Sequence, residues 1–253
     1  GLRFVRCGVC RYRGCHSRRC LRLQKKERLR RNILPYGETM NDRNPGAMGR
    51  GLFIVLEGGD GCGKTTQAAR LCRRLEAARA RRCLSEREPD SRDIVGAVVR
   101  SAYYGSVKIL PETLAYLHVA DRLEHIKFML PLLEGGADIV CDRYYPSNMA
   151  YNRTPRLSME QIYELNRPCF EQLDADLIIY LDVSPEETAR RRAAGRTAEE
   201  IFDADETQRA VLRNYRETLD YLAERGRRIA VIDASASEDE VADDIWCAVA
   251  GLI

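Results

Sequence analysis

The sequence predicts an α/β fold, a three-layer sandwich in which a five-stranded parallel sheet has helices on both faces. Five short apolar runs carry this prediction: residues 52–57, 82–86, 137–142, 176–183 and 228–233. They lack strict polar alternation, as do strands that are buried on both faces. The segments between them, such as TQAARLCRRLEAARA, carry apolar residues at three- and four-residue spacing, as amphipathic helices do. This alternation of the two kinds of segment is typical of a parallel sheet between helices.

The chain is expected to divide into a basic leader, residues 1–47, and one domain, residues 48–253. The first 50 residues contain 14 Lys and Arg but only 3 Asp and Glu, whereas the rest of the chain is mildly acidic. At 253 residues, 45% of them hydrophobic, the chain can bury one sizeable core. No run of about twenty apolar residues and no apolar signal segment is found, so we expect a cytoplasmic protein without a membrane span.

The leader contains four closely spaced cysteines. The segment is CGVCRYRGCHSRRC, with thiols at Cys7, Cys10, Cys15 and Cys20. The spacing resembles that of a zinc knuckle, in which such ligands bind zinc and nearby arginines suit nucleic acid. The favoured interpretation is instead a disordered basic tail or a segment that is not native, with Met40 or Met48 as the true start. A targeting segment rich in arginine is a third interpretation. Nucleic acid is therefore not expected as the main partner.

A glycine-rich turn follows the first apolar run. Gly58-x4-Gly63-Lys64-Thr65 leads directly into a predicted helix, which is the context of a Walker A phosphate loop in P-loop NTPases. Backbone N–H groups of such a loop surround phosphate oxygens, the lysine reaches the β- and γ-phosphates, and the Thr65 hydroxyl binds Mg²⁺. A strand–helix turn without a ligand is the alternative. The residues expected to bind ATP or GTP are Gly58, Gly59, Asp60, Gly61, Cys62, Gly63, Lys64, Thr65 and Thr66.

Asp142 and Arg143 close the third apolar run. Ligands of open parallel sheets collect at the carboxyl ends of the strands. Asp142 is therefore expected to hold Mg²⁺ through water, as a Walker B acid does, and Arg143 is expected to bind a phosphate with two hydrogen bonds. A simple ion pair between these two residues at the end of a strand is the alternative.

Six segments occur in an order and spacing that resemble those of thymidylate kinases. They are LEGGDGCGKTTQ, EREP, VADRLEH, CDRYYPSNMAY, LDVSPEE and VIDASAS, and the resemblance extends from Leu52 to the C-terminus. It implies a P-loop kinase with a short lid that transfers the γ-phosphoryl group of ATP to dTMP, with Mg²⁺, in dTTP biosynthesis. It also implies a homodimer.

The resemblance assigns three side chains to the acceptor nucleotide. Arg143 would bind its phosphate, and Arg122 would donate to a carbonyl of the thymine ring. The alternative for Arg122 is an exposed helix arginine that pairs with a neighbouring acid. His118 stands where the family usually has a phenylalanine that stacks on the base. A neutral imidazole stacks less strongly and is expected to titrate near neutral pH, which leaves the preference for thymine open.

Four further positions follow from the same resemblance. Asn148 would hydrogen-bond the pyrimidine edge, and Tyr151 would crowd the 2′ position of the sugar. Asp60 would contact the 3′-hydroxyl and neighbouring arginines. An arginine near the acceptor phosphate is either Arg87 or Arg92, and Arg87 is preferred.

Arginines of a mobile lid are expected to complete the site. Some family members carry a catalytic arginine at the position of Gly61, so here the positive charge must come from elsewhere. The segment RRRAAGR, residues 190–196, can supply it, because a mobile arginine can neutralise charge on the transferring phosphoryl group. Arg192 and Arg196 are preferred, ahead of Arg190 and Arg191. A solvated basic helix end is the alternative.

Two other functions stay open at this level. One is a related kinase that acts on another nucleoside monophosphate or on a deoxynucleoside; Glu88-Pro89 is similar to the segment of deoxynucleoside kinases in which a glutamate activates a hydroxyl. The other is a nucleotide- or RNA-binding regulatory protein that works through the cysteine-rich leader. For the leading function the expected catalytic residues are Lys64, Asp142, Arg143, Arg192 and Arg196.

Overall fold

The computed structural model describes residues 49–253 except 91 and 196–204. The predicted leader with Cys7, Cys10, Cys15 and Cys20 lies outside the described residues, and so does Arg196. The expectations for these positions stay predictions. In the part of the chain that is described, no helix is long and apolar enough to cross a membrane.

Five parallel strands form one sheet in the order β2-β3-β1-β4-β5. The strands are β1 Phe53–Glu57, β2 Cys83–Arg87, β3 Asp138–Asp142, β4 Leu177–Asp182 and β5 Ile229–Asp233. Each lies within a predicted apolar run, apart from β2, which continues one residue further to Arg87. The predicted parallel sheet is confirmed.

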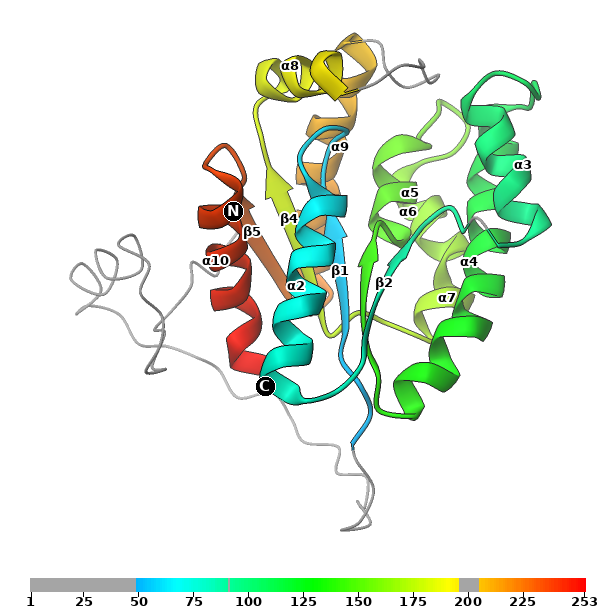
Figure 1. Ribbon diagram of the computed structural model, residues 1–253. Helices are drawn as coiled ribbons and strands as arrows, with labels where there is room; N and C mark the ends of the chain where they lie inside the picture. The colour runs from blue at the N-terminus through cyan, green and yellow to red at the C-terminus, as the bar shows by residue number, and fades with distance from the viewer. Residues whose placement is uncertain (1–48, 91, 196–204) are drawn as a thin grey trace.

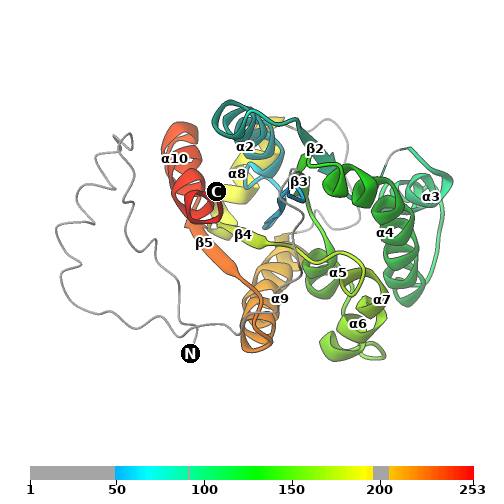
Figure 2. The same ribbon diagram turned by 90° about the horizontal axis from the view of Figure 1, so that it is seen from below.

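Helices cover both faces of the sheet, as predicted (Figures 1 and 2). Phe53 and Val55 of β1 belong to one apolar cluster, and Ile54 and Leu56 belong to another, so alternate side chains enter opposite layers. The second cluster is completed by α2 (Lys64–Arg79) and α10 (Glu238–Val249). The opposite layer consists of α4 (Pro111–Glu134), α5 (Tyr145–Tyr151), α6 (Met159–Leu165), α7 (Arg167–Phe170) and α9 (Asp205–Glu224).

Two of the described helices lie outside these layers. The helix α3 (Ile94–Tyr103) packs against α4 through Val99, Ala102 and Leu114. The helix α8 (Pro185–Gly195) contacts α9 and lies beyond the ends toward which the strand arrows point (Figure 1). A short 3-10 helix, η1 (Ala250–Leu252), ends the chain. The carboxyl ends of the strands therefore face α8, where a lid is expected.

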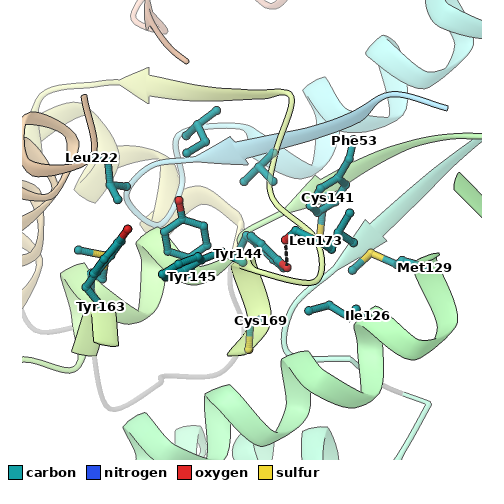
Figure 3. Packing of buried hydrophobic residues seen from close by; sticks show 14 of the residues in the cluster. Phe53, Ile126, Met129, Cys141, Tyr144, Tyr145, Tyr163, Cys169, Leu173 and Leu222 are labelled. Atoms are coloured by element: carbon teal, nitrogen blue, oxygen red, sulfur yellow. Dashed lines mark hydrogen bonds between the residues drawn. The ribbon is translucent and has the colours of Figure 1, made fainter. Parts of the chain in front are cut away.

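An aromatic cluster anchors the segment after β3 (Figure 3). Tyr144 packs edge-to-face on Phe53 of β1, with ring centroids 5.1 Å apart. Its hydroxyl donates to the Leu173 carbonyl at 2.7 Å, so the polar tip is satisfied inside the core. Because Tyr144 directly follows Asp142 and Arg143, this packing fixes the end of the strand that carries these two predicted site residues.

Candidate active site

The loop between β1 and α2 has the geometry of a phosphate loop. Gly63, the N-cap of α2, has φ +96°, a backbone conformation that favours glycine. Lys64 is buried, and its ammonium group donates to the carbonyls of Gly58 at 3.0 Å and Gly59 at 2.8 Å. The lysine therefore lies back over the loop, beside the positive end of α2, where phosphate oxygens bind favourably.

Thr65 and Asp142 meet at the start of α2. The Thr65 hydroxyl donates to Asp142 Oδ2 at 2.6 Å. The other carboxylate oxygen, Oδ1, is buried and has no hydrogen-bond partner among the residues that the structure describes. Mg²⁺ takes oxygen ligands from carboxylates, phosphates and water. A hydroxyl oxygen beside a buried, unpartnered carboxylate oxygen therefore fits this ion.

Arg143 joins the phosphate loop to the acceptor side. Its Nη2 donates to Asp60 Oδ1 at 2.6 Å and to the Tyr151 hydroxyl at 3.1 Å, and Nη1 donates to Ser147 at 3.0 Å and Tyr215 at 3.2 Å. Burial opposes the charge, but Tyr151 and Asp60 hold the pKa of Arg143 well above its ordinary value. The suggested ion pair with Asp142 is wrong, because Arg143 pairs with Asp60 instead.

Arg143 also has a strained backbone, with φ +76°. A bulky residue in this region is a rare exception that surrounding structure has to maintain, and such residues cluster at functional sites. Here the backbone N–H donates to the Leu56 carbonyl at 2.9 Å, and the guanidinium group is held by its several acceptors. These hydrogen bonds hold the Arg143 side chain in one position.

Glu57 supports this position, although sequence reasoning did not assign it a role. The carboxylate is fully buried at the end of β1 and accepts from Ser147 at 2.6 Å and from Tyr215 at 2.8 Å. Burial raises the pKa of Glu57 above its ordinary value, against the effect of these hydrogen bonds. Both hydroxyls in turn accept from Arg143. The sequence does carry one signal for this role, because Glu57 is an acidic residue at the end of an otherwise apolar strand.

The residues predicted to contact the acceptor nucleotide line one cavity of about 450 Å³. It lies between the phosphate loop, the end of β2 and the helices α3, α4 and α5. All seven residues predicted to contact the acceptor line it: Asp60, Arg87, His118, Arg122, Arg143, Asn148 and Tyr151. The volume is in the range of small-molecule sites.

His118 is buried and neutral. Its Nε2 lies 2.8 Å from the Tyr103 hydroxyl, and the centroids of the two rings are 5.7 Å apart. Burial lowers the pKa of His118 to about 3, and the nearby cations Arg122 and Arg143 act in the same direction. The expectation that this side chain titrates near neutral pH is therefore wrong.

Arg122 is 1% exposed and belongs to a buried network. Its Nη2 donates to Glu88 Oε2 at 2.6 Å, and its Nη1 donates to Asn166 Oδ1 at 2.5 Å. The alternative of an exposed helix arginine is therefore wrong. Glu88 is engaged by Arg122 and approached by His125 at 3.4 Å, so it is an ion-paired group rather than an available base.

The two candidate arginines after β2 differ in their contacts. Arg92 donates to Glu86 at 2.6 Å and to Asp90 at 2.9 Å, whereas the Arg87 side chain is exposed at the end of the strand. Both line the cavity. These contacts of Arg92 favour Arg87 as the phosphate ligand.

Asn148 lines the same cavity and is buried. Its amide nitrogen donates to the Ala115 carbonyl at 3.1 Å, and its amide oxygen accepts from Asn152 at 3.0 Å. An amide nitrogen has two N–H groups, so one remains for a ligand.

The lid arginines are described only in part. Arg190 and Arg191 each donate to Glu187 at 2.7 Å, on the surface of α8. Arg192 lies in the same helix, but its side chain and the whole of Arg196 fall outside the described residues. The catalytic role predicted for Arg192 and Arg196 stays a prediction.

Fold and site together define a P-loop NTPase architecture whose phosphate loop borders an arginine-lined cavity. The family described as Thymidylate kinase matches residues 56–245. A probable thymidylate kinase of Pyrococcus abyssi is 37% identical over 204 residues, which cover 78% of this chain and 94% of that protein. A thymidylate kinase of Synechococcus sp. (strain JA-3-3Ab) is 37% identical over 201 residues, covering 78% and 95%. One from Thermomicrobium roseum is 38% identical over 201 residues, covering 78% and 93%.

The chain belongs to the thymidylate kinase family. The resemblance drawn from its motifs is confirmed, and so is the predicted fold class.

Proposed function

We propose that this chain is a dTMP kinase that uses ATP as co-substrate and forms dTDP for dTTP biosynthesis. The observation that carries the proposal is the 2.6 Å contact between Arg143 and Asp60, which joins the phosphate loop to the arginine-lined cavity. A triphosphate on the loop and an anionic acceptor beside Arg143 would face each other across this pair.

The reaction is a transfer of one phosphoryl group. An oxygen of the dTMP 5′-phosphate forms a bond to the γ-phosphorus, the bond to the bridging oxygen breaks, and ADP leaves. The acceptor oxygen is already anionic, so no general base is needed. Catalysis then consists of positioning and charge neutralisation, by Lys64 on the donor, Arg143 on the acceptor, and Arg192 or Arg196 after lid closure.

Mg²⁺ belongs to the proposal as a cofactor. Thr65 and Asp142 are the residues that would hold it, Asp142 partly through water, since the pair offers a hydroxyl and an unpartnered carboxylate oxygen. When bound, the ion would neutralise negative charge that develops on the phosphate oxygens during transfer.

The acceptor is proposed to be a nucleotide rather than a nucleoside. A deoxynucleoside kinase needs a free carboxylate near the 5′-hydroxyl, and Glu88 is held by Arg122 at 2.6 Å. His118, Arg122 and Asn148 are proposed to contact the base, and Tyr151 and Asp60 the sugar. The neutral imidazole of His118 can stack on thymine without placing a charge against it.

A homodimer and a cytoplasmic location complete the proposal. Among the described residues, the large apolar side chains that are exposed lie on α3, on α4 and on the loop between them, apart from Ile253. They are Ile94, Tyr104, Val107, Leu110, Tyr116 and Phe128. Exposed apolar patches often mark interaction surfaces. Light scattering after gel filtration tests the dimer, and cell fractionation tests the location.

The direct test is product identification. The purified chain is incubated with ATP, Mg²⁺ and dTMP, and nucleotides are separated by anion exchange. We expect equal amounts of ADP and dTDP, and no dTDP from Lys64→Ala at unchanged circular dichroism. Absence of dTDP with the wild-type chain would refute the proposal.

A further inference from the structure

A row of alternating charges forms one wall of the acceptor cavity. It runs from Arg122 to Glu88, then to His125, to Glu86 and to Arg92. The acids and Arg92 come from the end of β2 and the loop after it, and Arg122 and His125 come from α4. Four of the five residues line the cavity, and His125 lies behind them with no exposed surface.

His125 faces a carboxylate on each side. Its Nδ1 lies 3.4 Å from Glu88 Oε1, and its Nε2 lies 3.2 Å from Glu86 Oε2. Each of these carboxylates also accepts from an arginine at 2.6 Å, which favours the ionised form. Ionised carboxylates only accept hydrogen bonds, and a neutral imidazole has a single N–H. Only the imidazolium form of His125 can donate to both neighbours.

The electrostatics agree with this geometry. Burial lowers the pKa of His125, but its hydrogen bonds to Glu86 and Glu88 outweigh that effect and raise the pKa to about 9. Asp90 adds to the negative potential. Asp121, also on α4, accepts from the Asp90 backbone N–H at 3.1 Å, and Arg100 donates to the Asp90 carbonyl at 2.8 Å.

Glu88 contacts both His125 and Arg122, so its orientation couples these two side chains. The carboxylate is 2% exposed and uses Oε2 for Arg122 and Oε1 for His125. Without the imidazolium ion, one buried oxygen of Glu88 would lose its partner, which is unfavourable in the interior. The carboxylate would then reorient, and Arg122 would move with it.

We propose that His125 is a positioning residue for the acceptor: its imidazolium ion fixes Glu88, and Glu88 fixes the guanidinium group of Arg122 in the cavity wall. The inference rests on the proposed function, because it assigns Arg122 to the acceptor nucleotide. His125 itself does not line the cavity.

The test compares three variants by steady-state kinetics. In His125→Gln, the introduced amide can donate to only one of the two acids, and its oxygen repels the other. We expect the KM for dTMP to rise about tenfold, with kcat and the KM for ATP within about twofold of wild type. In Glu86→Gln/His125→Gln, one acid and one cation are removed together, and the two introduced amides can hydrogen-bond each other while the one at position 125 still donates to Glu88. Most of the KM loss should therefore be recovered. Lys127→Gln, an exposed change on the same helix, should behave as wild type.

A wild-type KM for dTMP in His125→Gln would overturn the inference. So would an equal rise of both KM values without recovery in the double variant, because that pattern indicates general damage. If His125→Gln does not fold, ring ¹⁵N shifts of the wild-type histidines decide the matter, since a neutral His125 at pH 7.5 would contradict the inference. A wild-type chain that turns over a different acceptor refutes only the proposed substrate, and the same comparison is then made with that acceptor.

Discussion

Arg143 is the residue on which the site depends most. It combines a positive φ with donation to Asp60, Tyr151, Ser147 and Tyr215. A planar guanidinium group can satisfy several acceptors in fixed directions, whereas an ammonium group is a single point charge. The geometry therefore requires arginine, and positive charge alone is not sufficient.

Replacing Arg143 with lysine tests this requirement. We expect Arg143→Lys to lower kcat/KM for dTMP by about 10²- to 10³-fold, as loss of a preorganised donor does, and to leave the KM for ATP nearly unchanged. The matched control is Arg167→Lys on α7, where the side chain is 53% exposed and pairs with surface acids. Comparable kcat/KM values for Arg143→Lys and the control would contradict the account.

The connection from β2 to α3 forms the cavity wall through close backbone contact. Asp93 caps α3 by accepting from the N–H groups of Val95 at 2.6 Å and Gly96 at 3.1 Å. A Cβ atom at Gly96 would lie 1.8 Å from the Asp90 carbonyl oxygen and 2.7 Å from the Asp121 carboxylate. Only glycine allows the helix and the loop to approach this closely.

The change Gly96→Ala should therefore separate α3 from the loop. We expect the free energy of unfolding in urea to fall by about 1–3 kcal/mol, the range found for overpacking. Gly251→Ala is the control, because a Cβ atom there meets nothing within 4 Å. Equal free energies of unfolding for the two variants would contradict this prediction, because they would mean that the loop shifts away from the new Cβ atom without loss of stability.

The sheet and the phosphate loop could be predicted at the level of elements because their signals are local. Each strand is a short apolar run, and the spacing from Gly58 to Thr65 directly encodes the loop. The burial of Arg122 could not be predicted, because its partners Glu88 and Asn166 are 34 and 44 residues away. Helical periodicity does not reveal such partners.

Two further features of the site could not be predicted for the same reason. The role of Glu57 depends on Ser147 and Tyr215, which reach it from α5 and α9. The neutral state of His118 depends on burial beneath Tyr103, which α3 supplies. Both are long-range consequences of packing, and one isolated sequence contains no direct signal for either.

His125, which lies behind the acceptor cavity, also makes the stability of the whole molecule depend on pH. The ordinary pKa of histidine is 6.5, and that of the folded side chain is about 9. Between these values the folded state holds a proton that the unfolded state lacks, so stability falls as pH rises. The pKa of Asp121, raised by burial to about 7, acts in the same direction below neutrality, and that of His118, lowered to about 3, acts in the opposite direction below pH 6.5. The thiols of Cys62, Cys83, Cys141 and Cys169, whose pKa values are raised by burial and by neighbouring groups, act in the same direction as His125 above pH 7, so the contribution of His125 is measured as the difference between the wild-type chain and His125→Gln.

We expect the free energy of unfolding of the wild-type chain to decrease by about 2 kcal/mol between pH 7 and 8.5 through His125. In His125→Gln this contribution is absent, so the decrease should be smaller by that amount. Urea unfolding of both proteins at the two pH values provides the measurement. Parallel decreases would mean that His125 is not protonated in the folded protein.

The proposed function requires the arginine-lined cavity to accept dTMP. The most direct measurement is a competition in which dTMP, dUMP, dGMP and thymidine are present together at equal concentration with ATP and Mg²⁺. Initial product ratios then give the relative kcat/KM values in one reaction. We expect dTDP to dominate the products and thymidine to remain unphosphorylated. Preferential formation of another diphosphate, or consumption of thymidine, would contradict the proposed function.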